Sequence, residues 1–236
     1  MRIELSDLGV TRREIRPGFR EEVRAILDEV RTGGDEAVLR LTERFDKAEL
    51  GPGQLRVDAR ELEASVGSLE PEVLRGLRTA IANVRAVVRA QARDPVSVEL
   101  EQGQRVEIVE IPVGRAAIYV PGGRAPYPST VVMGAVTARA AGVDEIAVCA
   151  PPGPGGRAHP VILAACVLCE VTEVYRMGGA QAIAALAYGA GSVRSVDVIA
   201  GPGNAWVQEA KRQVAFTEVG IDGVAGPSEL AVIADG

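Results

Sequence analysis

The sequence is short of the residue types that mark several classes of protein. Its 236 residues include one histidine and three cysteines, and aromatic side chains make up 3% of the chain. No stretch of membrane-spanning length is free of glycine, proline and charge, and the mixed, acidic start of the chain lacks the apolar core of a signal peptide. The net charge of −6 comes from interspersed acidic and basic residues, without a basic stripe or polybasic segment. We therefore expect a globular, cytoplasmic protein that binds small molecules or proteins, with no nucleic acid and no membrane as partner.

The cysteines Cys149, Cys166 and Cys169 lie in apolar surroundings, and their odd number fits reduced thiols. Cys166 and Cys169 have the spacing of a metal or redox motif, but the sequence offers no second ligand pair to complete a zinc site. The run over residues 161–169 has the composition of a buried helix. We interpret the two cysteines as small apolar side chains on one face of that helix and not as metal ligands.

Amphipathic helical patterns dominate residues 1–113. Apolar residues recur with the 3.6-residue helical period, and proline, glycine and aspartate stand where helices begin and end. Beyond the last helix, apolar and polar residues alternate on both sides of a Gln102-Gly-Gln turn, which indicates a β-hairpin. The predicted elements are helices over 17–33 and 35–45, a short strand over 55–57, a short helix capped by Asp58, a helix over 71–93 with an apolar stripe that includes Val73, and the hairpin over 96–111.

From residue 114 onward, short apolar runs alternate with helical segments. The predicted strands cover residues 116–120, 145–149, 173–176, 196–200 and 230–234, and Ser129 is expected to cap the helix after the first of them. Regular alternation of strand and helix indicates βαβ crossovers and a parallel sheet. We predict a parallel, doubly wound sheet of the Rossmann-like α/β class over 114–236, preceded by the N-terminal helical region and β-hairpin over 1–113.

Glycine-rich loops follow four of these strands. The loop Gly201-Pro-Gly-Asn204 opens into a helix, so backbone N–H groups and the positive end of the helix dipole meet there. Because the carboxyl ends of parallel strands share one edge, Tyr119, Gln181 and Asn204 are expected to face a common polar pocket. Each also has a structural alternative: a core tyrosine with a locally satisfied hydroxyl, a partner of a helix N-terminus, and an N-cap.

Six motifs, taken together in this order and spacing, resemble the histidinol dehydrogenase family. They are Tyr119-Val-Pro-Gly-Gly, Ala125-Pro-Tyr-Pro-Ser-Thr, Gly178-Gly-Ala-Gln-Ala-Ile-Ala-Ala-Leu-Ala-Tyr-Gly, Gly201-Pro-Gly-Asn-Ala, Glu209-Ala-Lys-Arg-Gln-Val and Ala225-Gly-Pro-Ser-Glu. The resemblance covers nearly the whole chain, including Thr32-Gly-Gly-Asp-Glu-Ala near its start. No single motif is sufficient to indicate the family.

The resemblance implies an enzyme that oxidises L-histidinol to L-histidine with two NAD molecules and a zinc ion, as a homodimer. It also implies that Tyr119, Gln181 and Asn204 contact NAD and that Ser228 contacts the substrate. A turn residue before the last strand is the structural alternative for Ser228.

The resemblance implies that residues 114–236 form a nucleotide-binding region that is truncated at its C-terminus. It places the zinc ligands, the general-base histidine and its neighbouring glutamate beyond the segment that ends at Asp235-Gly236. We interpret His159 as a surface residue at a helix start. Lys211 and Arg212 have two interpretations, steering of a phosphate or surface pairs on their helix, and we favour the surface pairs. We therefore predict no catalytic residue in this chain and expect that it does not oxidise histidinol alone. Two readings remain open: the N-terminal portion of a histidinol dehydrogenase, or a non-catalytic binding or interaction module that keeps the nucleotide-binding fold.

Overall fold

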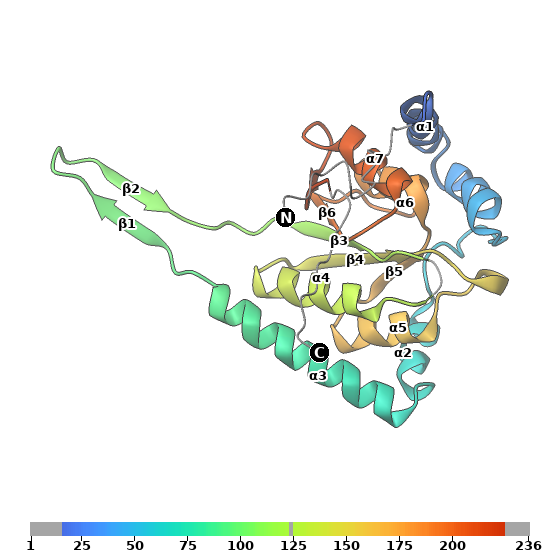
Figure 1. Cartoon of the computed structure of the whole chain (residues 1–236), viewed down its shortest axis with the longest axis horizontal. Helices are drawn as coiled ribbons and strands as arrows, with labels where there is room; N and C mark the ends of the chain where they lie inside the picture. Colours follow the sequence, from blue (N-terminus) through green and yellow to red (C-terminus); the bar gives the residue numbers. More distant parts are fainter. Residues whose placement is uncertain (1–15, 123–124, 225–236) are drawn as a thin grey trace, which may run out of the picture.

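A five-stranded parallel sheet lies at the centre of the protein, in a computed structural model that describes residues 16–122 and 125–224. The strand order is β5-β4-β3-β6-β7, with helices on both faces of the sheet (Figure 1). The strands are β3 (Arg115–Tyr119), β4 (Glu145–Ala150), β5 (Glu173–Arg176), β6 (Val198–Ala200) and β7 (Gly220–Ile221). The predicted Rossmann-like α/β fold is confirmed.

The chain changes its direction across the sheet after β5. From β3 it passes outward to β4 and β5, then crosses back and places β6 on the other side of β3. Ala117 of β3 accordingly pairs with Ala147 of β4 on one side and with Ile199 of β6 on the other. The loops that leave the carboxyl ends of β3 and β6 run to opposite faces, and such a switch point is where doubly wound sheets bind ligands.

Helices cover both faces because the strands are apolar on both. Ala116 and Ile118 of β3 belong to one hydrophobic cluster, whereas Ala117 and Tyr119 belong to the other. The first face carries α4 (Pro128–Ala140) and α5 (Pro160–Leu168), backed by α3 (Pro71–Gln91) and α2 (Ala59–Gly67); the second carries α6 (Gly179–Tyr188) and α7 (Ala205–Val214), backed by α1 (Phe19–Asp46). The N-terminal helices thus complete both layers.

Helix α1 consists of two helical segments that meet at Gly34. This residue has φ 55° and ψ −139°, a conformation that favours glycine. The predicted break between two helices at this point is therefore confirmed. Its consequence is positional, because the second segment ends at Asp46, beside the carboxyl ends of the strands.

The predicted strand over residues 55–57 is reduced to one antiparallel bridge between Arg56 and Tyr175 of β5. This short contact covers the outer edge of the sheet, which would otherwise present unpaired backbone groups. Asp58 then caps α2, as predicted, by accepting a hydrogen bond from the Arg60 N–H at 2.8 Å.

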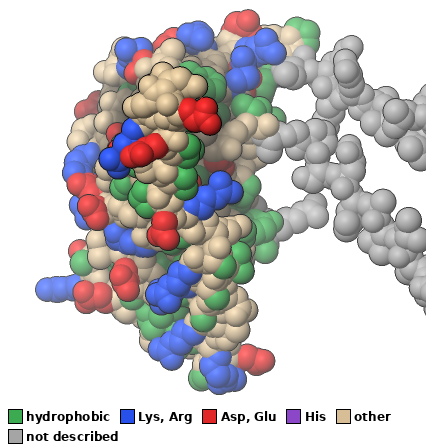
Figure 2. Space-filling view, turned by 90° about the vertical axis from the view of Figure 1, so that its left-hand side faces the viewer, with side chains coloured by type: hydrophobic (Ala, Val, Ile, Leu, Met, Phe, Trp, Pro, Cys, Tyr) green, Lys and Arg blue, Asp and Glu red, His purple; other side chains and the backbone are tan. Residues whose placement is uncertain are grey.

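The predicted hairpin is present as β1 (Val96–Glu99) and β2 (Arg105–Ile108). It extends away from the sheet beyond the end of α3, and every residue of its two strands is exposed (Figure 1). The face seen from the hairpin end carries acidic and basic side chains mixed with apolar ones (Figure 2), in keeping with the interspersed charge of the sequence. On α3, Leu77 is buried but Val73 is exposed, so the predicted apolar stripe is only partly covered.

Two details differ from the sequence prediction. Helix α4 begins at Pro128, and its N-cap position is Tyr127, without a side-chain cap, so the predicted cap at Ser129 is wrong. Proline presets the backbone for the first helical turn, so the helix starts at Pro128, two residues earlier than a cap at Ser129 would place it. The described part of the sheet ends with β7, which was not predicted because its two residues are too few to show the apolar pattern of a strand. The strand predicted over 230–234 lies outside the described residues.

The three cysteines are free and buried. Cys166 and Cys169 belong to the hydrophobic cluster around α5, which confirms their interpretation as apolar side chains. Burial raises the pKa of the Cys149 thiol to about 12 and that of Cys169 to about 11. These thiols are protonated at neutral pH and are poor nucleophiles or ligands.

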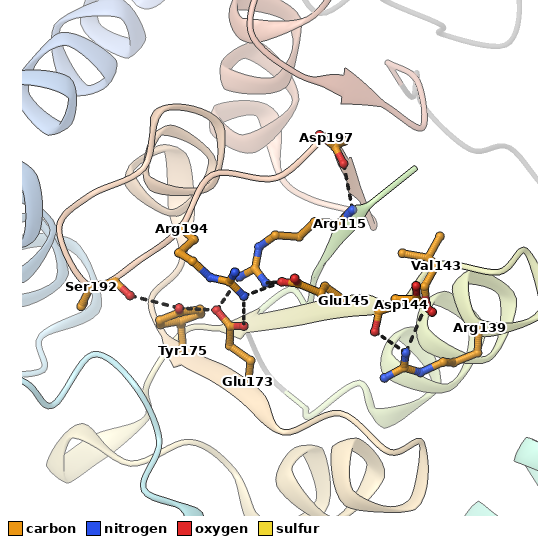
Figure 3. Close-up of polar contacts among 10 residues, drawn as sticks. All are labelled: Arg115, Arg139, Val143, Asp144, Glu145, Glu173, Tyr175, Ser192, Arg194 and Asp197. Atoms are coloured by element: carbon orange, nitrogen blue, oxygen red, sulfur yellow. Dashed lines mark hydrogen bonds and ion pairs between the residues drawn. The ribbon is translucent and has the colours of Figure 1, made fainter. Parts of the chain in front are cut away.

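A network of charged side chains joins the amino ends of β3, β4 and β5 (Figure 3). Arg115 donates to Glu145 at 2.8 Å and to Glu173, and exposed Arg194 pairs with both carboxylates. The Tyr175 hydroxyl also donates to Glu173. Burial alone would raise the pKa of Glu173, but the hydrogen bonds from Arg115 and Tyr175 outweigh it and lower that pKa. The network therefore stabilises the fold above the unfolded-state pKa of a glutamate and weakens in acid.

We predict that Arg115→Met lowers the free energy of unfolding by about 2 to 4 kcal/mol, because it leaves the Glu173 carboxylate buried without its main partner. The matched control Arg194→Met removes an exposed guanidinium from the same network and should cost much less. Urea unfolding at pH 7.5 measures both. Equal effects of the two substitutions would contradict this account of the network.

Candidate functional site

A pocket of about 910 Å³ opens at the carboxyl edge of the sheet, on the side opposite the charge network. Its walls come from the segments that follow β3, β4, β5 and β6, so the strand exits meet as expected. Tyr119, Gln181 and Asn204 all line it. The volume is in the range of small-molecule sites, about 300 to 1,000 Å³.

Tyr119 forms part of the pocket wall while most of its ring lies in the core. The residue is 3% exposed, and its hydroxyl oxygen accepts a hydrogen bond from the Gly179 N–H at 3.1 Å. Burial raises the pKa of the phenol above its ordinary value, so the hydroxyl keeps its proton. Tyr119 is therefore a core tyrosine whose hydroxyl oxygen is satisfied locally, which was its structural alternative. The phenolic O–H remains able to donate a hydrogen bond.

Gln181 lies in the first turn of α6 and is 1% exposed. Its Nε2 donates to Asp46 Oδ2 across 3.3 Å. Gly179 holds this turn with φ 63°, and a Cβ at that position would lie 2.6 Å from Gln181 Oε1. The left-handed backbone conformation favours glycine there, and any larger residue would also displace the end of the Gln181 side chain.

Asn204 caps α7, as the sequence indicated. Its Oδ1 accepts hydrogen bonds from the N–H groups of Trp206 at 3.0 Å and Val207 at 3.2 Å. The cap uses the amide oxygen, so the amide NH₂ group is available as a donor at the helix end that lines the pocket. Capping and ligand contact are compatible at this residue.

Lys211 is buried, which corrects its interpretation as a surface residue. Its Nζ donates to the Gly201 carbonyl at 2.7 Å and pairs with Asp222 Oδ1 at 2.5 Å, while Asp222 Oδ2 accepts from the Gly201 N–H at 2.8 Å. We call these three residues the Gly201 clamp. It fixes both backbone groups of Gly201, whose φ is 126° and whose Cβ, if present, would lie 2.1 Å from the Tyr119 carbonyl oxygen. Arg212 is half-exposed and pairs with Glu209, but the Glu209 side chain is buried, so the prediction of a surface pair is only partly correct.

Asp46 is a pocket residue that the sequence analysis missed. It comes from the end of α1, outside the α/β region, and nothing in its local sequence points to the sheet. Burial raises the pKa of its carboxyl to about 6. Burial of Asp46 therefore costs folding free energy in full above about pH 6, and the cost declines as the pH falls from there towards the unfolded-state pKa of 3.8.

His159 was predicted to be an exposed residue at a helix start, and it is the N-cap of α5, with Nδ1 accepting from the Val161 N–H at 3.2 Å. It also lines the pocket, together with Arg157.

Ser228, the predicted substrate contact, lies outside the described residues. Within 16–122 and 125–224, no group of three or more histidine, cysteine, aspartate or glutamate side chains could hold a metal ion, and no helix is long and apolar enough to cross a membrane.

This strand order, with a pocket at the switch point, defines a doubly wound α/β protein of the Rossmann-like class. The family model described as histidinol dehydrogenase matches residues 11–236. The chain therefore belongs to the histidinol dehydrogenase family, and the resemblance drawn from its motifs is confirmed.

Individual relatives agree with this assignment. The chain is 46% identical over 216 residues to the histidinol dehydrogenase of Gluconobacter oxydans, covering 92% of this chain and 50% of the relative. It is 48% identical over 217 residues to that of Thermobifida fusca, covering 91% and 49%. The crystal structure of histidinol dehydrogenase from Elizabethkingia anophelis superposes with a TM-score of 0.86 at 31% identity, covering 96% and 52%. The chain thus spans about half the length of the relatives that it matches.

We predict that Lys211→Met loosens the loop over residues 201–204. The substitution removes a buried, charged hydrogen-bond donor worth roughly 1.5 to 3 kcal/mol, so local opening should become at least about tenfold more frequent. Amide hydrogen exchange of the peptide that contains Gly201 measures this opening. Arg78→Met removes an exposed charge from the remote helix α3 and serves as the control; unchanged exchange in Lys211→Met would contradict the clamp.

Proposed function

We propose that this chain supplies the NAD-binding part of an enzyme that oxidises L-histidinol to L-histidine. The observation that carries the proposal is the meeting of Tyr119, Gln181 and Asn204, from three separate strand exits, in one pocket at the switch point. Membership of the histidinol dehydrogenase family supports the substrate and the reaction.

The pocket residues suit a dinucleotide. Asn204 offers its amide NH₂ group as a donor, and Gln181 and Tyr119 add an amide and a phenol that hydrogen-bond to hydroxyl or amide groups. Helices α6 and α7 begin at the pocket, and their N-terminal dipoles favour the negative charge of a pyrophosphate. When bound, NAD supplies the hydride acceptor. The residues of this chain bind and orient it, and the buried walls exclude water from its inner side.

The zinc ion that the family implies does not fit the described residues, which hold no cluster of suitable ligands. We propose that its ligands, and the groups that move protons during the oxidation, belong to residues outside 16–122 and 125–224. Ser228 is proposed to contact the substrate there. No step of the reaction is assigned to a residue of the described part.

We also propose that the complete protein is a cytoplasmic homodimer. The support within this chain is the projecting β1–β2 hairpin, whose exposed side chains include Val96, Val106 and Ile108. An apolar surface of this kind is typical of a contact with a protein partner.

The nucleotide assignment is tested by calorimetry with NAD. We predict that Gln181→Ala and Asn204→Ser each weaken binding about tenfold, the effect of losing one hydrogen bond of roughly 1.4 kcal/mol. Asn204→Ser keeps an oxygen that caps α7, so it separates ligand contact from capping. Asp58→Ala, which removes the cap of the remote helix α2, is the control. Tight binding that survives both pocket substitutions would refute the assignment.

The reaction is tested separately by following NADH formation. We expect this 236-residue chain, mixed with L-histidinol, NAD and zinc, to form no NADH above the reagent blank, because the ligands and proton-transfer groups are proposed to lie elsewhere. The full-length Thermobifida fusca histidinol dehydrogenase is the positive control. Turnover by this chain at about 1 s⁻¹ or faster, the range of ordinary enzymes, would contradict the proposed division of the site.

A further inference from the structure

Asp46 is the carboxylate that lines the pocket within the described part of the chain. The other charged or titratable side chains along the walls are Arg157, His159 and the phenol of Tyr119. Asp46 reaches the pocket from α1, and its Oδ2 accepts the long hydrogen bond from Gln181. The proposed NAD contacts and this carboxylate therefore share one wall.

The position is unfavourable for a carboxylate in the absence of a ligand. Asp46 is the last residue of α1, where the negative end of the helix dipole opposes an anion. Among the described residues no cation pairs with it: the neighbouring Lys47 donates to the Arg44 carbonyl, and Arg44 lies over the ring of Phe45. Burial raises its pKa to about 6. A charge that is kept in a cleft against these costs is a candidate for ligand binding.

Aromatic surface lies directly beside this carboxylate. Phe45 and Trp206 both line the pocket, with ring centroids 6.5 Å apart, and Phe45 is 44% exposed. Arg44 lies over one face of the Phe45 ring, so the exposed remainder of that ring and the Trp206 ring form the surface on which a base can pack. The ionised carboxylate beside them accepts hydrogen bonds from ribose hydroxyls.

Within residues 16–122 and 125–224, no segment that follows a strand contributes a carboxylate to the pocket lining. In doubly wound folds an acidic residue after the second strand commonly binds the ribose of the nucleotide. Here the second strand of the sheet along the chain, β4, ends at Ala150 and is followed by Pro151, Pro152 and Gly153. Asp46, by contrast, brings a carboxylate to the pocket from α1, outside the sheet.

We propose that Asp46 binds the vicinal hydroxyls of the adenosine ribose of NAD and thereby selects NAD over NADP. This inference rests on the proposed function. Two carboxylate oxygens accept the two ribose O–H groups, whereas the 2′-phosphate of NADP would bring a second anion to the same place and remove one donor.

The test compares NAD, NADP and NAD that lacks the 2′-hydroxyl of its adenosine ribose, by calorimetry at pH 8. The unaltered chain should bind NAD at least about tenfold more tightly than either analogue, the effect of one charged hydrogen bond. Asp46→Asn should weaken NAD about tenfold and leave NADP no weaker, so that the preference disappears. Glu43→Gln, an exposed neutralisation one turn earlier in α1, should keep the preference.

The outcomes separate this proposal from the function on which it rests. If the unaltered chain binds no NAD, both fall. If Asn204→Ser and Gln181→Ala weaken NAD but Asp46→Asn changes neither affinity nor preference, the assignment of Asp46 alone is overturned. Equal weakening of NAD and NADP also overturns it. Because the unaltered chain is compared across three ligands, the result does not depend on the folding of the variant, and absence of any preference there is sufficient to reject the proposal.

Discussion

The close approach of Gly201 to the carbonyl of Tyr119 is the constraint on which the site depends. At the switch point, the segment after β6 must pass so near the end of β3 that a side chain at residue 201 has no space. The Gly201 clamp holds the backbone in this position, because buried Lys211 binds the Gly201 carbonyl and Asp222 binds the Gly201 N–H. Because the loop is fixed, α7 begins at the pocket and Asn204 presents its amide there.

Stability and binding are divided between the two edges of the sheet. The charge network of Arg115 and Glu173 joins the amino ends of three strands, whereas the glycine loops and the pocket occupy the carboxyl ends. A parallel sheet permits this division because all strand exits share one edge. Helix α1 also contributes to the site. Its break at Gly34 determines the direction of its second segment, which ends at Asp46 in the pocket.

The sequence predicted the sheet and much of the pocket, and the physical reason is locality. Apolar runs of strand length and the turn residues after them depend on short-range patterns, so the exits carrying Tyr119, Gln181 and Asn204 could be identified. The roles of Asp46 and Lys211 could not be predicted, because they depend on partners that local patterns do not reveal. Asp46 contacts Gln181, which follows β5, and Lys211 pairs with Asp222, which follows β7. A lysine on an amphipathic helix is ordinarily exposed, and only the position of Asp222 reverses that expectation.

The central claim is that NAD binds at the switch point of the sheet. Its most direct test is titration of the isotope-labelled chain with NAD, followed through backbone amide chemical shifts. We expect the largest changes in residues 119–122, 179–181 and 201–204, with Arg115, Glu145 and Glu173 at the opposite edge unaffected. Changes centred on the amino edge, or no changes at saturating NAD, would contradict the account.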